Sequence, residues 1–474
     1  MVGILAAQTW AEEQFSLCDL GDKRRTSRLI KMAATLCTRI GKSFSHCCQG
    51  NEAMLEGGYR LIRNEDVRPE DIAEGIFKST HEKSKERNLL LALEDTTTIS
   101  YPHAVEGLGD TGGPVESSSL GFHAHSILMV DGHTKDTLGL IAQTRWIRKK
   151  EERGKSHERM NRAYEEKESF KWEKSSRELE NRMQSEMSKV ISICDREADI
   201  YEYLSYKLNR DHRFVVRAGN NRKLYEELGE KLEDAIAIAP ELGEYTIEIL
   251  QKSGRKARTA TLCLKSCQVE IAPPKRLSIS TNAPLEVNVV IATEINNKSS
   301  EQSLSWILLT SEDVNDFLQA RAVTGHYETR WRIEEFHKAW KTGAGVEAQR
   351  MQTAGNIERM AVILSAIAVR LLQLKEGLEK EELKNTNAIS CRQVLTADEF
   401  IVLWYAAQPK KGKKKKVPKE IPSLSWAYKT IAKLGGWADT KRLGRASWAT
   451  IWDGWFCLQE RLAGYLVAKE IAEM

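Results

Sequence analysis

Apolar and polar positions divide this chain of 474 residues into a helical beginning, a strand-rich middle and a helical end. After Asp22, apolar side chains recur every three or four positions, at Leu29, Ala33, Leu36 and Ile40. This period predicts an amphipathic helix, for which Asp22 is a suitable N-cap. A second helical stretch, Glu52–Arg63, follows. We therefore predict that residues 1–70 form a helical N-terminal domain.

Two short apolar runs in the middle of the chain each lead into an acid. Residues 89–93 precede Glu94 and Asp95, and residues 190–194 precede Asp195. Runs of this length predict buried strands, so we expect Asp95 and Asp195 at the ends of two strands. Asp195 also has a plainer alternative role, as the N-cap of a helix that follows it.

A hairpin is predicted between these two runs. Residues 126–131 and 137–143 are rich in apolar side chains, and the turn-like residues Gly132 and His133 lie between them. His123 and His125 alternate at the start of the first strand, and a structural role is expected for both. From residue 212 to residue 310 the chain carries further short strand patterns, separated by turns rich in Gly, Pro and Asn. These predict a β-rich insertion.

Residues 327–341 contain no proline and no glycine and are expected to form one helix. At about 100° per residue, one quarter of its circumference would carry Tyr327, Arg330, Glu334, Lys338 and Lys341. The other faces would offer apolar contact through Ile333, Phe336 and Trp340. An ordinary solvated helix with ion pairs such as Glu334–Lys338 is one interpretation. The tyrosine and the arginine in the same stripe favour a surface that binds a polyanion.

The end of the chain is predicted to be helical on either side of a basic linker. Residues 359–374 have the composition of a core helix, and the lysine-rich residues 409–420 are expected to be a linker. In the last segment, apolar residues recur at alternating spacings of three and four, at Trp448, Ile451, Trp455, Leu458, Leu462 and Tyr465. Such a seam suits either packing within the chain or dimerisation.

Composition narrows the classes of function. The formal charge is only +4, so any case for nucleic-acid binding rests on local clusters. One such cluster is a stripe of Arg24, Arg28 and Lys31, and no acid occurs between Lys23 and Lys42. The longest apolar run, residues 360–369, is about half a membrane span, so we expect no membrane partner, and no signal peptide is apparent. The nine cysteines lack zinc-finger spacing and fit reduced thiols in a cytoplasm.

Asp95, Asp195 and Glu334 could together hold hard divalent cations, because Mg²⁺ prefers oxygen ligands. Two such ions would activate a water or a 3′-hydroxyl and stabilise the leaving oxygen. Their spacing in sequence is not a signature by itself, since a chain with 67 acids contains many such triples.

A family resemblance is carried by the spacing of Tyr327, Arg330, Glu334 and Lys341. Upstream stand Asp195-Arg196-Glu197-Ala198-Asp199 and, before them, Glu94-Asp95-Thr96-Thr97. Together these motifs resemble the DDE transposases of the IS-four type, and the resemblance covers nearly the whole chain. It implies that Asp95, Asp195 and Glu334 are the metal-binding catalytic acids. It also implies contacts with DNA by Arg217, Trp306, Tyr327, Arg330, Lys338, Lys341 and Arg350, where Trp306 would receive a flipped base. In the N-terminal domain, the candidate DNA contacts are Arg24, Arg25, Arg28 and Lys31.

The implied fold is α/β, with a ribonuclease-H-like catalytic core interrupted by the β-rich insertion and flanked by helical N- and C-terminal domains. We expect a DNA-binding domain at residues 1–70, a catalytic domain at 71–375 with the insertion at about 212–310, and a dimerisation domain at 376–474. The implied activity is cut-and-paste DNA transposition with two Mg²⁺ ions, for which Mn²⁺ substitutes. Expected partners are double-stranded DNA, as transposon ends and target, and a second copy of the chain in a synaptic homodimer. The expected location is the bacterial cytoplasm, associated with the nucleoid. The alternatives are a decayed transposase that inhibits by binding DNA, and a plain nuclease.

Overall fold

A computed structural model describes residues 7–103, 105–111, 120–148, 162–225, 230–249, 258–274, 283–296, 303–384, 390–391, 395–409, 415–440, 446 and 448–473. The chain divides into two compact units. Unit 1 comprises Met1–Ser79, Thr98–Phe122 and Glu335–Met474, and unit 2 comprises Thr80–Thr97 and His123–Glu334. Among the described helices, none is long and apolar enough to cross a membrane. All nine cysteines are free thiols.

The first helices of unit 1 follow the predicted pattern. They are α1 (Ala7–Phe15), α2 (Lys23–Thr38), α3 (Phe44–Cys47), α4 (Glu52–Arg63) and α5 (Pro69–Ser84), the last of which continues into unit 2. Asp22 caps α2 by accepting a hydrogen bond from the backbone N–H of Arg24. Leu29, Ala33 and Leu36 are buried on one side of α2, as predicted. The helix ends at Thr38, however, so Ile40 lies beyond it and is only partly buried.

The end of unit 1 is also helical. It contains α11 (Ala354–Lys384), α12 (Ala397–Ala406), α13 (Leu424–Leu434) and α14 (Trp448–Glu473). Residues 360–369 lie in α11 and are buried, which confirms the core helix. Residues 415–420, in the described part of the expected linker, form neither helix nor strand, and residues 410–414 lie outside the described residues.

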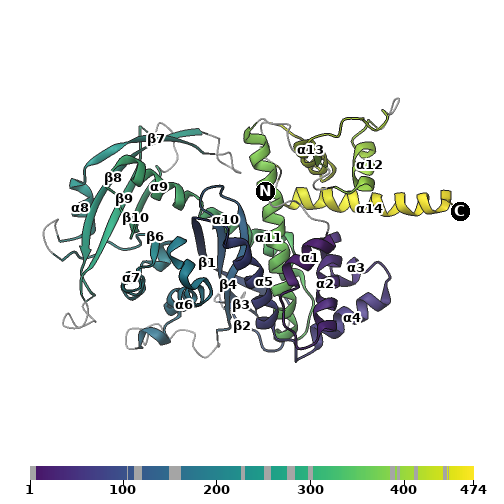
Figure 1. The fold of residues 1–474 in the computed structure, drawn as a ribbon, viewed down its shortest axis with the longest axis horizontal. Coiled ribbons are helices and arrows are strands. Elements are labelled where there is room, and N and C mark those ends of the chain that lie inside the picture. The colour runs from purple at the N-terminus through teal and green to yellow at the C-terminus, as the bar shows by residue number, and fades with distance from the viewer. Residues whose placement is uncertain are drawn as a thin grey trace. The chain divides into compact units, whose positions relative to one another are not determined.

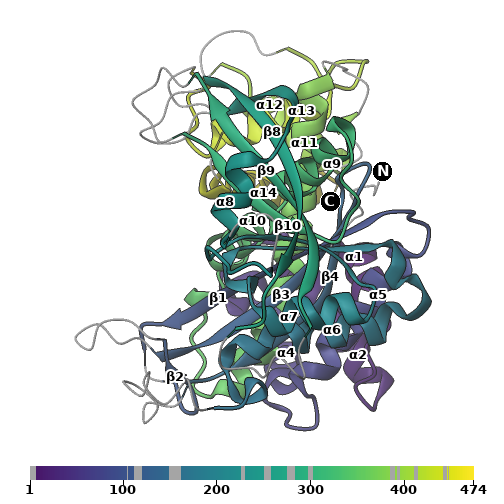
Figure 2. The ribbon, with the colours of Figure 1, turned by 90° about the vertical axis from the view of Figure 1, so that its left-hand side faces the viewer.

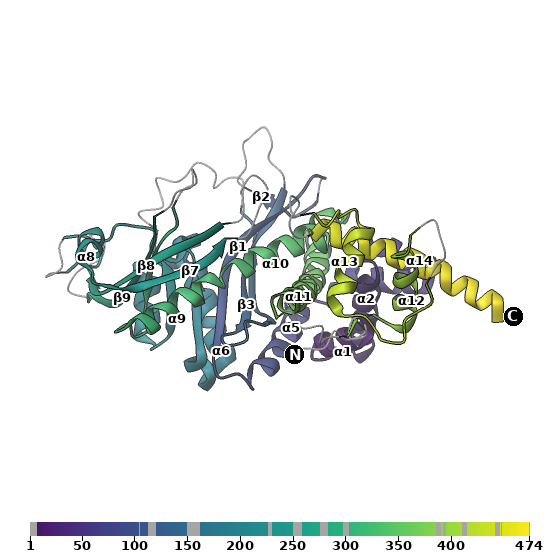
Figure 3. The ribbon, with the colours of Figure 1, turned by 90° about the horizontal axis from the view of Figure 1, so that it is seen from above.

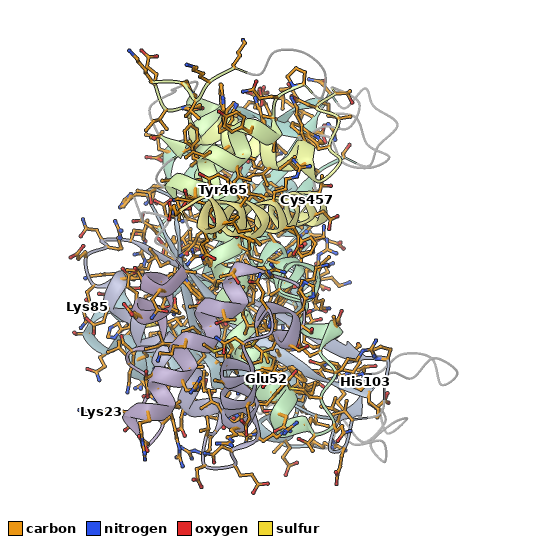
Figure 4. All side chains as sticks on the ribbon, turned by 90° about the vertical axis from the view of Figure 1, so that its right-hand side faces the viewer. Lys23, Glu52, Lys85, His103, Cys457 and Tyr465 are labelled. Carbon is orange, nitrogen blue, oxygen red and sulfur yellow. The ribbon has the colours of Figure 1, made fainter. Side chains whose placement is uncertain are left out.

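The apolar seam of α14 is used within the chain. Ile451 and Leu458 are buried in a cluster with α12 and α13, and Trp455, Leu462 and Tyr465 pack against that cluster. The side chain of Trp448 lies outside the described residues. Figure 3 shows α14 continuing past α12 and α13 to the C-terminus, and Figure 4 shows Cys457 and Tyr465 along it. Of the two alternatives for this seam, the structure supports packing within the chain.

Unit 2 is built on a large mixed sheet. Its strands are β1 (Leu90–Tyr101), β3 (Leu120–Asp131), β4 (Thr137–Trp146), β5 (Val190–Cys194), β6 (Arg213–Arg217), β7 (Glu241–Ile249), β8 (Arg258–Ile271), β9 (Leu285–Ile295) and β10 (Ser305–Thr310). They are ordered β4-β3-β1-β5-β6-β10-β9-β8-β7, and Figure 1 shows β7–β10 to the left of β1. The last residues of β1, from Thr98, and the first residues of β3, up to Phe122, belong to unit 1. There the short β2 (Gly109–Asp110) pairs with β3.

Pairing divides this sheet into a parallel centre and an antiparallel wing. β5 pairs in parallel with both β1 and β6, whereas β3 and β4 form the predicted antiparallel hairpin. The strands predicted within the insertion are present, but β6 belongs to the parallel centre. The others extend the same sheet through the antiparallel contact of β10 with β6. The insertion therefore shares hydrogen bonds with the strands that carry the acids.

Helices cover the sheet of unit 2. They are α6 (Lys171–Met183), α7 (Tyr201–Asn209), α8 (Leu232–Ile238) and α9 (Phe317–Glu328), together with the start of α10 (Trp331–Lys338). Leu179 and Met183 of α6 join a core cluster with Leu90 and Ile127 of β1 and β3. A second cluster joins α7 and α8 to strands β5, β6, β8, β9 and β10, and Figure 2 shows α8 beside β8.

Two predicted elements have different boundaries in the structure. β1 continues to Tyr101, so Asp95 lies inside the strand rather than at its end. The three threonines after Asp95 are β-branched and favour the extended backbone. The single helix predicted for residues 327–341 is wrong, because α9 ends at Glu328, α10 begins at Trp331, and residues Ala339–Gly343 form a π-helical turn.

Thr329 explains the break between α9 and α10. Its hydroxyl donates a hydrogen bond to the carbonyl of Gly325, four residues back, a local bond that competes with regular helix geometry. The backbone N–H groups of Thr329 and Arg330 bond to carbonyls only three residues back, which tightens the turn. Arg330 therefore lies between two helices rather than within one.

Candidate active site

The parallel pairing of β1 with β5 brings two of the predicted acids together. Leu93 is in register with Ile193, and Asp95 and Asp195 each lie two residues further along. Neighbouring strands lie about 4.8 Å apart, and residues in register point to the same face of a sheet. Two acids separated by 100 positions in sequence therefore become neighbours, as predicted.

Local hydrogen bonds hold both carboxylates. The Asp95 carboxylate accepts a bond of 2.8 Å from the N–H of Thr96. The Asp195 carboxylate accepts one of 2.8 Å from the N–H of Glu197 and caps the short 3-10 helix Arg196–Ala198. Asp195 thus fills the N-cap role that its position also predicted. Asp195 can serve both as an N-cap and as a site residue beside Asp95, because the capping bond uses only one of its two carboxylate oxygens.

Glu334 joins this group through Arg330. The Arg330 guanidinium donates to the Glu334 carboxylate one turn later, and its other terminal nitrogen lies 3.8 Å from the Asp95 carboxylate. The partner of Glu334 is therefore Arg330 rather than Lys338, the partner suggested by a solvated helix. The Arg330 side chain is only 10% exposed, against 39% for Glu334 and 19% for Asp95.

Burial and neighbouring negative charge disfavour the ionised form of Asp95 and so raise its pKa. Burial, followed by the charge of Asp195, raises the pKa of Asp95 to about 6 from an ordinary 3.8. The Thr96 N–H and the Arg330 charge oppose this rise, and Glu334 adds to it. Burial alone would lower the pKa of Arg330, but nearby Tyr327, Glu334 and Asp95 raise it, so Arg330 stays charged. A site that disfavours its own carboxylate charge is suited to a cation.

The donor chemistry fits Mg²⁺, which binds carboxylate oxygens. In the part of the chain that the structure describes, however, no three His, Cys, Asp or Glu side chains are arranged to hold an ion. The positive charge beside Asp95 and Glu334 is instead that of Arg330.

Three residues predicted to contact DNA form a cluster beside these acids. The Trp306 ring on β10 packs edge-on against the Tyr327 ring, with centroids 5.9 Å apart. Arg217 donates to the carbonyl of Ser305 and hydrogen-bonds to Tyr327. Burial raises the pKa of Tyr327, while the charges of Arg330 and Arg217 lower it. Trp306 is half-buried rather than fully enclosed in its strand.

The other predicted DNA contacts lie in unit 1. Lys338 is exposed one turn after Glu334 on α10, and Lys341 lies in the π-helical turn. Arg350 is exposed, with one guanidinium nitrogen 3.3 Å from the ring of His103. On α2, Arg24 and Lys31 are exposed, and Arg24 pairs with Asp22.

Two of the α2 arginines are engaged within the N-terminal helices. Arg25 donates to the carbonyl of Leu20 and pairs with Asp66 at 2.6 Å. The guanidinium of Arg28 lies against Gly57 of α4, where any larger side chain would collide with it. Lys23, at the start of α2, points outward (Figure 4).

Sequence reasoning missed two features around the acids. Trp331 is 52% exposed, and the Arg330 guanidinium lies 5.7 Å from the centre of its ring. The signal available in the sequence was this tryptophan, which lies outside the apolar face of the predicted helix. The second feature is Glu94, which faces the core from the strand position next to Asp95 and lies 3.6 Å from His125. His125 in turn lies 2.9 Å from the Thr96 hydroxyl, which supports the structural role predicted for that histidine.

Comparison with known proteins bears first on the N-terminal helices. Residues 7–67 match the family described as Transposase DNA-binding. This segment is therefore similar to a transposase DNA-binding domain. Its matched residues extend from α1 past α4 and include the basic residues of α2.

Among solved structures, the chain is similar to the piggyBac transposase in a cryo-EM structure of its synaptic complex with hairpin DNA. The sequences are 11% identical and the TM-score is 0.40, over 81% of this chain and 77% of that one. A likeness at this level establishes no activity for this chain.

Proposed function

We propose that this protein is a DDE transposase that binds transposon ends and carries out cut-and-paste transposition. The observation that carries the proposal is the convergence of Asp95, Asp195 and Glu334. Asp95 lies in β1, Asp195 directly follows β5, which pairs in parallel with β1, and Glu334 is linked to Asp95 through Arg330. The transposase DNA-binding domain at residues 7–67 supplies an independent reason to expect DNA as the substrate.

The proposed catalytic fold is a ribonuclease-H-like core. Its support is the parallel centre β1-β5-β6, with the antiparallel hairpin of β3 and β4 beside β1. Asp95 and Asp195 lie on or after strands of that centre, and β7–β10 form the insertion. The two helical ends would supply DNA binding and dimerisation.

Asp95, Asp195 and Glu334 would hold two Mg²⁺ ions, or Mn²⁺ in their place. When bound, Mg²⁺ would activate the attacking oxygen and stabilise the leaving one. The chain's own cations would hold the DNA backbone, and they are Arg217, Arg330, Lys338, Lys341, Arg350 and the basic residues of α2. Trp306 and Tyr327 offer aromatic faces to a base that leaves the stack.

The proposed reaction proceeds on two transposon ends held by a homodimer. Water attacks a phosphodiester at each end and frees a 3′-hydroxyl. That hydroxyl attacks the opposite strand to form a hairpin, and a second water opens the hairpin. The 3′-hydroxyl then attacks target DNA and joins the element to it.

An assay on DNA carrying the flanking ends of the protein's own element tests this proposal. The full chain is incubated with end-labelled duplex and Mg²⁺, beside a scrambled duplex and the Asp195→Ala variant. We expect cleavage at the end sequence by the native chain. The variant should bind the ends without cutting, because binding rests on the cations.

Other outcomes would support one of the alternative functions or exclude a site residue. Binding without cleavage by the native chain would favour the decayed inhibitor. Cleavage of scrambled and end DNA alike would favour a plain nuclease. Normal cleavage by Asp195→Ala would show that Asp195 is not a catalytic residue.

A further inference from the structure

The position of Arg330 has a consequence for metal binding. Its guanidinium is ion-paired with Glu334, lies 3.8 Å from Asp95, and is held in a side chain only 10% exposed. One fixed positive charge thus lies beside two of the three proposed metal ligands. A divalent cation that approached these oxygens would meet that charge at close range with little water to screen it.

The surroundings of Arg330 would allow its guanidinium to leave the two acids for another partner. Arg330 lies in the tightened turn between α9 and α10, and the half-exposed ring of Trp331 lies 5.7 Å from its guanidinium carbon. A guanidinium can pair with phosphate as it does with carboxylate, because its planar N–H groups match two oxygens of either group. A DNA phosphate near Trp331 would therefore compete with Glu334 and Asp95 for Arg330.

We propose that Arg330 is a counter-ion that couples metal binding to DNA binding. In the DNA-free protein it neutralises Asp95 and Glu334 and weakens their affinity for divalent cations. A phosphodiester of bound DNA draws the guanidinium away and frees the carboxylates for the metal. The inference rests on the proposed function in taking these acids as metal ligands, and it adds that the ligands are blocked until DNA arrives.

Manganese binding to the full chain without DNA tests the first half. The probe is Mn²⁺ alone, with the free ion followed by electron paramagnetic resonance. Arg330→Gln removes the charge and keeps much of the side-chain length. We expect it to bind Mn²⁺ at least about ten-fold more tightly than the native chain, within the usual range of coupling between two ligands.

Arg332→Gln is the matched control. It removes the same charge two residues away on α10, where the guanidinium donates to the carbonyl of Lys135. We expect native Mn²⁺ affinity from it. The double variant Asp195→Ala/Arg330→Gln should lose the gain, which would locate the ion among the acids. Circular dichroism checks folding, and Arg330→Met replaces Arg330→Gln if the latter fails to fold.

DNA binding tests the second half. Fluorescence anisotropy of a labelled random duplex is measured with and without Mn²⁺. Linkage requires that if DNA strengthens metal binding, metal strengthens DNA binding by the same factor. We expect Mn²⁺ to raise the DNA affinity of the native chain about ten-fold, and that of Arg330→Gln much less.

The coupling is overturned if Arg330→Gln binds Mn²⁺ no more tightly than the native chain, if Arg332→Gln gains as much, or if Mn²⁺ affects DNA affinity equally in both proteins. None of these measurements uses cleavage. Tighter Mn²⁺ binding without end-specific cleavage would keep the counter-ion and reject the transposase. The reverse result would reject the counter-ion alone.

Discussion

Replacing Asp95 by asparagine should make the metal-free protein more stable at neutral pH. The pKa of this carboxyl rises from 3.8 to about 6 on folding, chiefly through burial and the charge of Asp195. A carboxyl with a raised pKa loses its proton less readily in the folded state. The folded state therefore loses stability as pH increases from about 4 to about 6, and the full cost persists above that range.

The cost follows from the pKa change. Moving the pKa from 3.8 to about 6 makes the ionised folded form about 3 kcal/mol less stable relative to the protonated form. Arg330 at 3.8 Å offsets part of the repulsion, but the pKa is still raised, so burial and repulsion are the larger effects. Asparagine has nearly the same shape as aspartate and no charge, so Asp95→Asn should recover most of this free energy.

Thermal unfolding in the presence of EDTA measures the gain. For a unit of this size, about 3 kcal/mol corresponds to a rise in Tm of roughly 5–10 °C at pH 8. At pH 4.5 the native carboxyl is mostly protonated when folded, and the difference should fall to about 1 kcal/mol. Asp313→Asn, which changes an exposed aspartate of the same unit, is the control and should leave Tm unchanged. An equal gain at both pH values, or no gain at pH 8, would refute the electrostatic reasoning.

Three further predictions concern DNA and packing. If the α2 stripe binds DNA phosphates, each single alanine variant should lower the slope of log K against log salt by roughly 0.9, tested at Arg24, Arg28 and Lys31. Unchanged slopes in filter binding for all three would mean that the stripe faces only solvent. Trp306→Ala should leave first-strand nicking nearly intact but slow hairpin formation about ten-fold, since stacking is worth about 1–3 kcal/mol per base; equal loss of both steps on a denaturing gel would contradict this. Leu458→Ala, in the buried seam of α14, should cost about 2–5 kcal/mol, and limited proteolysis that released α14 no faster than in the native chain would show that the seam contributes little.

The sequence was sufficient for elements with strong periodicity. The helix after Asp22, the β3–β4 hairpin and the strands β6–β10 lie where the residue patterns predicted them. Asp195 directly follows β5, as predicted. Each of these features depends on residues close together in the chain, which is the range over which a pattern carries information.

Features that depend on long-range pairing could not be predicted from the residues alone. The apolar runs predict that residues 89–93 and 190–194 are strands, but not that the two strands pair in parallel with Leu93 in register with Ile193. The break at Thr329 was missed because helical periodicity continues across it, while one side-chain bond to Gly325 alters the turn. The resemblance to a family supplied the grouping of Asp95, Asp195 and Glu334 that local patterns lack.

The continuity of the sheet fixes the spacing between Asp195 and Trp306, the residue proposed to receive a base. β6 alone separates β5, which leads into Asp195, from β10, which carries Trp306. Leu308 is opposite Arg217, so Trp306 and Arg217 lie on the same face. A single inserted residue in β10 would turn the indole to the other face without touching any acid. Such a variant would keep the proposed cleavage residues but lose hairpin formation. The length of β10 would then be as constrained as the identity of the proposed catalytic residues.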